Sequence, residues 1–183
     1  MIATALFVCP IGSDAALLPR TAAITDAYHE LLTANLERLS QWEPWASEPT
    51  AVDGTRMFLE ARGRAWLEGN ELPVAIAVRA ENGWRLVGSA GLQIDRYSQS
   101  ADAGYWIDGE FEGRGLVTRT MEILLDQAFG PLGLARVSVQ TEAGNQRSRG
   151  CRSAPGIHRG GPAPPGHGIP RPAPRLGRLR AVG

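Results

Sequence analysis

The sequence predicts a mixed α/β fold with a mostly antiparallel sheet flanked by helices. Its 183 residues fit one domain, and a hydrophobic content of 43% is enough for a true core. The spacing of apolar residues also changes along the chain, from helical spacing to a run of strand-like segments and back to helical spacing. Because strands and helices do not alternate regularly, the pattern excludes a doubly wound dinucleotide-binding fold.

The first part of the chain is expected to hold a strand and a helix. Leu6–Val8 is a short strand candidate. Apolar residues recur at helical spacing over residues 22–39, after Pro19 as a start signal. The segment Trp42-Glu43-Pro44-Trp45 should end this helix, because a proline disfavours helical backbone in the residue before it.

A second helix and the main strands are expected next. Thr50 is the expected cap of a helix that runs to about Trp66 and ends at Gly69-Asn70. The remaining elements are strands at 74–78 and 86–92 joined by a turn at 81–83, a strand at 103–107, a helix from Gly115 to Gly130-Pro131, and a strand at 136–140.

Charge divides the chain into two segments. Residues 1–149 contain 13 arginines and all 19 acidic residues, a formal charge of −6, and residues 150–183 contain six arginines and no acid, a formal charge of +6. The acidic first segment argues against nucleic acid as a main partner. No apolar run predicts a membrane span, and the N-terminus lacks the basic stretch of a secretory signal, so we expect a cytoplasmic protein.

A glycine-rich loop precedes the third expected helix. Gly113 and Gly115 are separated by one residue at the helix start, where several backbone N–H groups lack helical partners. These donors and the positive end of the helix dipole favour a phosphate, which glycine allows to approach closely. Such a loop, taken alone, is more often a tight turn than an anion site.

An ordered set of motifs makes the prediction more specific. Tyr105-Trp106-Ile107 is followed by Glu112-Gly113-Arg114-Gly115, Leu134-Ala135-Arg136-Val137 and Asn145-Gln146-Arg147-Ser148. In this order the motifs resemble the GNAT superfamily of N-acetyltransferases, and most closely its Rim-type, ribosomal-protein branch, over about residues 15–149. The resemblance implies the GNAT fold, with splayed central strands, as the domain of residues 1–149.

The resemblance also implies acetyl-CoA as cosubstrate. Pantetheine would bond to the exposed strand edges as an added strand does. The pyrophosphate site would be made by five consecutive backbone amides, those of Gly113, Arg114, Gly115, Leu116 and Val117. The chain departs from the family's Gln/Arg-x-x-Gly-x-Gly/Ala pattern in its outer positions, which hold Glu112 and Val117. A carboxylate is an unusual neighbour for a phosphate.

Candidate catalytic residues follow the last expected strand. Asn145 would bond to the pantetheine arm or an ordered water, although it equally fits a helix cap, and Ser148 would lie near the leaving thiolate. Glu142 is the candidate general base, with a solvated loop acid as the alternative. Trp42 and Trp45 either line an acceptor cleft or pack in the core. No Ser-His-Asp set or metal-ligand spacing is present, so neither a hydrolase nor a metal site is expected.

The implied reaction is direct transfer of acetyl from the thioester to a primary amine. An α-amino group, with a pKa of about 7.7–8.0, demands less of a base than a lysine side chain at about 10.4. The expected acceptor is therefore a peptide N-terminus, and a small-molecule amine is the alternative. A homodimer paired through an exposed edge of the strand at 136–140 is a further expectation.

Residues 150–183 form a Gly/Pro/Arg-rich tail that does not match the family. Glycine, proline, arginine and alanine make up 25 of its 34 residues, which is typical of low-complexity segments. Residues 155–157 can be encoded so that the frame one nucleotide later reads Leu-Gly-Phe, as relatives do, and residues 174–182 can likewise encode their final strand. A frameshift near codons 149–150 is the resulting hypothesis. The chain would then lack the C-terminal part of the fold, and a catalytically impaired remnant that at most binds CoA is the alternative to an active enzyme.

Overall fold

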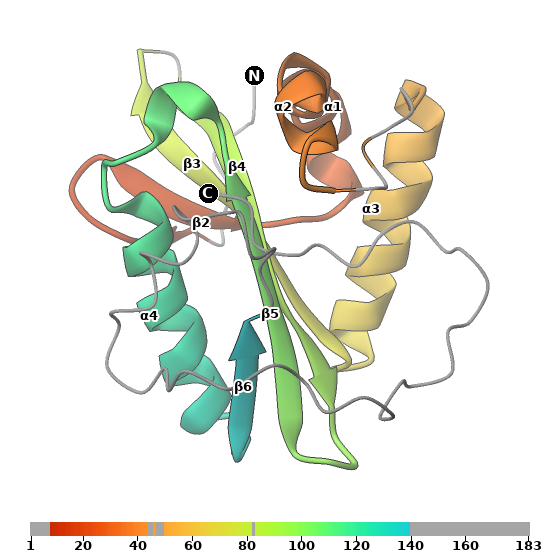
Figure 1. Cartoon of the computed structure of the whole chain (residues 1–183), viewed down its shortest axis with the longest axis vertical. Coiled ribbons are helices and arrows are strands. Elements are labelled where there is room, and N and C mark those ends of the chain that lie inside the picture. Colours follow the sequence, from red (N-terminus) through yellow and green to blue (C-terminus); the bar gives the residue numbers. More distant parts are fainter. Residues whose placement is uncertain (1–7, 44–45, 47–49, 82, 140–183) are drawn as a thin grey trace.

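The computed structural model describes residues 8–43, 46, 50–81 and 83–139, which fold around a six-stranded sheet (Figure 1). The strands lie in the sheet in chain order, and each neighbouring pair is antiparallel except β5 and β6, which are parallel. Their bounds are β1 Cys9–Pro10, β2 Ala15–Pro19, β3 Glu71–Ala80, β4 Gly83–Asp95, β5 Ser100–Ile107 and β6 Arg136–Val139. The expected mixed, mostly antiparallel sheet is confirmed.

Helices cover both faces of this sheet. The described helices are η1 Ala22–Ile24, α1 Thr25–Ala34, α2 Leu36–Ser40, α3 Val52–Leu67, η3 Gly109–Phe111 and α4 Leu116–Phe129. Figure 1 shows α1, α2 and α3 on one face and α4 on the other. Each face has its own apolar core, because successive strand residues point to opposite sides. Ile107 thus packs on the α4 side and Trp106 on the α3 side.

The N-terminal strands differ from the expectation. The expected strand at Leu6–Val8 lies outside the described residues except for Val8, and a described strand, β1, follows it directly. The segment Ala15–Pro19 forms β2, a strand that was not expected from the sequence. Its first four residues are buried. A strand covered on both faces lacks the alternation by which strands are recognised.

The helix expected over residues 22–39 is broken into η1, α1 and α2. Asn35 separates α1 from α2, with φ −108° and ψ 4°. Its side-chain Nδ2 donates to the carbonyl oxygen of Leu31 at 3.0 Å. Asparagine commonly offers the backbone such local bonds in place of a continuing helix, which explains the break.

The second expected helix is α3, with one correction. Its N-cap is Ala51 rather than Thr50, and no side chain caps it. Its C-terminal end follows the expectation, because Gly69 has a left-handed φ of +71°. The N–H of Gly69 donates to Trp66 and the N–H of Asn70 to Ala65, both at 2.8 Å, which is the Schellman arrangement.

The end of β5 positions the site. The ladder between β5 and β6 runs from Ser100 opposite Arg136 to Ala103 opposite Val139. β5 itself continues to Ile107, where it still pairs with Gly88 of β4. The last four residues of β5 therefore extend beyond the described ladder and lead directly into the loop before α4. Residue 140, expected in the last strand, lies outside the described residues.

Candidate functional site

The glycine loop, residues 112–115, joins η3 to α4. Gly113 has φ +73° and Gly115 has φ +70°, a backbone conformation that favours glycine. A Cβ atom added to either residue would meet no atom within 4 Å. Open space over two left-handed glycines leaves the loop backbone accessible to a ligand.

The first turn of α4 begins at this loop. Gly115 is the N-cap and provides no side-chain hydrogen bond, and the first turn has no acidic residue. The N–H of Arg119 donates to the carbonyl of Gly115 at 3.1 Å. The amides of Leu116 and Val117 precede that bond and have no partner within the helix. The structure thus brings the five predicted phosphate-binding residues to one helix N-terminus, the local geometry that binds anions.

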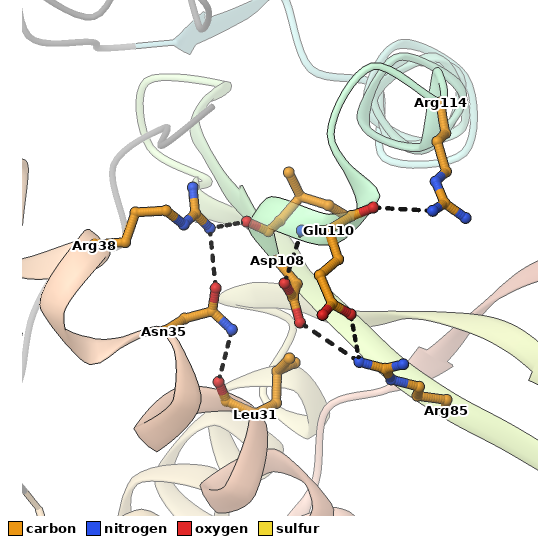
Figure 2. Close-up of polar contacts among 8 residues, drawn as sticks. Leu31, Asn35, Arg38, Arg85, Asp108, Glu110 and Arg114 are labelled. Carbon is orange, nitrogen blue, oxygen red and sulfur yellow. Dashed lines mark hydrogen bonds and ion pairs between the residues drawn. The ribbon is translucent and has the colours of Figure 1, made fainter.

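Two arginines stabilise the η3 turn next to the loop (Figure 2). Arg85 of β4 pairs with Glu110 at 3.0 Å and with Asp108 at 4.0 Å. Arg114 donates to the carbonyl oxygen of Glu110 at 3.0 Å. Both guanidinium groups also lie over the ring of Phe111, with distances to its centroid of 5.0 Å for Arg85 and 4.5 Å for Arg114.

The unusual Glu112 has a cationic partner. Its Oε1 accepts from Arg38 Nη1 at 2.8 Å, and the exposed fractions of the two side chains are 19% and 27%. Arg38 was not among the predicted site residues. No local pattern signals it, because α2 is separated from the loop by more than seventy residues.

A groove of about 390 Å³ lies beside the glycine loop on the α4 side of the sheet. Arginines dominate the charged residues of its wall, which include Arg79, Arg85, Arg114, Arg119 and Asp14. Such a surface favours anionic ligands near the loop.

A buried polar cluster lies on the opposite face, between α3 and the sheet. Arg20 Nη2 and Arg62 Nη1 each lie 2.9 Å from an oxygen of Glu71. Burial raises the pKa of Glu71, and the two guanidinium groups offset part of that effect. The cluster borders a cavity of about 10 Å³, the size of one water, which is also lined by Asp102 and Gly104 of β5. Glu71 and Asp102 were not among the predicted site residues.

The predicted catalytic residues cannot be placed in this geometry. Glu142, Asn145 and Ser148 lie outside the described residues, as does Trp45. Trp42 is half-buried and packs against the core on the α3 side, in agreement with the packing interpretation. Within the described ranges, no three His, Cys, Asp or Glu side chains gather as metal ligands. No helix in those ranges is long and apolar enough to cross a bilayer.

The six-stranded, mostly antiparallel sheet and the glycine loop before α4 agree with the fold that the resemblance implied for an N-acetyltransferase. The family model of the acetyltransferase (GNAT) domain matches residues 17–154, and the chain belongs to this family. Its enzyme class is therefore acetyltransferase.

Several named proteins are similar to this chain in sequence or in fold. YdaF of Bacillus subtilis, named as a candidate ribosomal N-acetyltransferase, is 27% identical over 146 residues, 79% of this chain and 78% of YdaF. A structure of RimL, the ribosomal L7/L12 α-N-protein acetyltransferase, in complex with CoA has a TM-score of 0.73 at 20% identity, over 80% of this chain and 81% of that one. A structure of Mycobacterium smegmatis RimJ in complex with a CoA disulfide has a TM-score of 0.67 at 23% identity, over 79% of this chain and 70% of the RimJ chain.

Proposed function

We propose that this protein transfers the acetyl group of acetyl-CoA to a protein N-terminal α-amine, with a ribosomal protein as the acceptor, in the cytoplasm. The observation that carries the proposal is the glycine loop, in which Gly113 and Gly115 leave an open, left-handed backbone at the N-terminus of α4. The RimL and RimJ structures, which contain CoA or its disulfide, support acetyl-CoA as cosubstrate. The names of RimL and YdaF support a ribosomal acceptor.

The cosubstrate would extend from the loop along β5. Its pyrophosphate accepts from the backbone amides of residues 113–117. Its pantetheine arm pairs with the part of β5 that continues beyond the described ladder, residues 104–107, as an added strand would. The thioester then lies near the point where the β5–β6 ladder closes, at Ala103 and Val139.

The reaction forms one C–N bond and breaks one C–S bond. The neutral amine attacks the thioester carbonyl, the thiolate of CoA leaves, and the amine loses one proton. We assign Ser148 to the thiolate, Asn145 to the pantetheine arm and Glu142 to the proton. The α-amine is the favoured acceptor because its pKa of about 7.7–8.0 leaves a substantial neutral fraction without a strong base.

An acceptor screen tests the proposal. The full chain is incubated with acetyl-CoA and with three acceptors separately: peptides that carry ribosomal-protein N-termini, a polyamine and an aminoglycoside. Mass spectrometry should find one acetyl group on the peptide α-amine. Modification of only a lysine ε-amine, the polyamine or the aminoglycoside would contradict the acceptor assignment. CoA binding without turnover on any acceptor would instead favour the catalytically impaired remnant.

A further inference from the structure

Glu112 places a carboxylate at the first position of the glycine loop. If the loop binds pyrophosphate, as proposed above, an uncompensated carboxylate there would repel the ligand. The repulsion would be considerable because Glu112 is only 19% exposed, and partly buried charges are poorly screened by salt. A cation that pairs directly with Glu112 would reduce this repulsion.

Arg38 of α2 contacts the residues on either side of the segment 108–111, which leads from β5 into the loop. Its Nη1 donates to Glu112 at 2.8 Å, and its Nη2 donates to the carbonyl oxygen of Ile107, the last residue of β5. A Cβ atom on Gly109, between these two points, would lie 3.6 Å from Arg38 Nε. One side chain thus spans the whole η3 turn and contacts the first residue of the loop.

The break between α1 and α2 is part of the same arrangement. Asn35, which separates the two helices, accepts from Arg38 Nη2 at 3.3 Å through Oδ1 and donates to Leu31 through Nδ2. Figure 2 shows this chain of contacts from Leu31 through Asn35 and Arg38 to the end of β5. The orientation of the Arg38 side chain is therefore fixed by Asn35, at the helix break, and by Glu112, in the loop.

We propose that Arg38 is a positioning residue for the acetyl-CoA phosphates. It neutralises Glu112 and holds the turn that presents the glycine loop, without itself contacting the ligand. This inference rests on the proposed function, since it assumes that the loop binds CoA. The alternative is that Arg38 only attaches α2 to the sheet, in which case its removal would lower stability without a specific effect on the phosphates.

A double-mutant cycle separates these alternatives. CoA binding is measured by calorimetry on the full chain for the wild type, Arg38→Ala, Glu112→Gln and the double variant, with the thermal melt of each variant as a check on folding. Arg38→Ala should weaken CoA binding about tenfold, because the negative charge of Glu112 beside the phosphates loses the cation that lies 2.8 Å from it. Glu112→Gln should bind at least as well as the wild type, and the double variant should recover most of the lost affinity.

Arg56, an exposed residue of α3, provides the control for loss of a positive charge. Arg56→Ala should leave CoA affinity unchanged. In turnover, Arg38→Ala should raise the KM for acetyl-CoA with little change in kcat or in the KM for the acceptor. Equal CoA affinity of Arg38→Ala and the wild type would overturn the role of Arg38 but not the proposed function. Equally weak CoA binding by Arg38→Ala and the double variant would have the same consequence. A wild-type chain that does not bind CoA would overturn the proposed function as well.

Discussion

Arg20 and Glu71 form an ion pair of 2.9 Å in which the two side chains are only 1% and 5% exposed. Arg20 directly follows β2 and also donates to Ser89 Oγ at 2.7 Å, so the pair joins the end of β2 to β3 and β4 beneath α3. Arg62 reaches the other oxygen of Glu71 from α3 and is 25% exposed. The ring of Phe58 lies 5.5 Å from each of the two guanidinium groups.

Loss of Arg20 should be strongly destabilising. Arg20→Met leaves Glu71 buried with one partner instead of two, and breaking a buried pair of this kind costs about 3 kcal/mol or more. Arg62→Met is the matched control, because its more exposed guanidinium should contribute less than about 1 kcal/mol. Urea unfolding of the two variants measures the difference, and equal losses would contradict the assigned roles.

The pH dependence of stability should reflect Glu71. Burial raises its pKa in the folded protein above the ordinary value of 4.5, so the folded protein retains this proton to a higher pH than the unfolded chain. The contribution of protonated Glu71 to stability is complete below about pH 4.5 and is lost as the pH rises through the raised pKa. The unfolding free energy of the wild type relative to Glu71→Gln should therefore fall from pH 4.5 towards neutrality. A relative stability that increases with pH over this range would show that the guanidinium groups outweigh burial.

The glycine loop offers a variant with a matched control. Gly115→Val should abolish detectable CoA binding while helix content stays near normal, because a side chain enters the open space over the loop and φ +70° is unfavourable for valine. Gly133 has φ +62° and equally open surroundings beyond the other end of α4, so Gly133→Val carries a similar backbone cost away from the loop. Calorimetry with CoA compares the two. Retained affinity in Gly115→Val would remove the basis of the loop assignment.

Local patterns in the sequence predicted most of the described fold. The strands β3, β4 and β5 and the helices α3 and α4 were each expected at their observed positions, because periodicity and glycine or proline signals mark them. The strand β2 was missed since its buried Ala and Leu residues do not alternate. The break at Asn35 was missed because the apolar spacing continues through it and the side-chain bond that replaces the helix is not visible in a pattern.

The candidate site was also predicted only in part from the sequence. The glycine loop was found because consecutive residues form it. Arg38 and Arg20 were not found, because their partners Glu112 and Glu71 are 74 and 51 residues away along the chain. Such contacts arise only when strands and helices pack, so no spacing rule identifies them. Glu142, Asn145 and Ser148 remain predictions, since they lie outside the described residues.

Residues 150–183, which also lie outside the described residues, have a composition that disfavours regular structure. Eight glycines raise the cost of ordering this segment, seven prolines remove backbone donors, and no aromatic residue is present to provide apolar area. We therefore predict that it forms no regular strand pair beside β6. The family model matches through residue 154, shortly after the proposed change of frame. Sequencing the DNA across codons 140–183 tests directly for an inserted or deleted nucleotide.

A chain restored to the alternative frame after Arg149 should be more stable and more active than the present one. The restored segment would provide the family's last helix and final strands, which cover the edge and apolar faces of β6. Thermal melts and acetyl-CoA turnover of the two proteins, measured side by side, give the comparison. A third protein that ends at Arg149 shows what the present tail contributes: its melting temperature should equal that of the present chain. Equal stability and turnover of the present and restored chains would mean that residues 150–183 are a genuine part of a working enzyme, and the frameshift hypothesis would then be wrong.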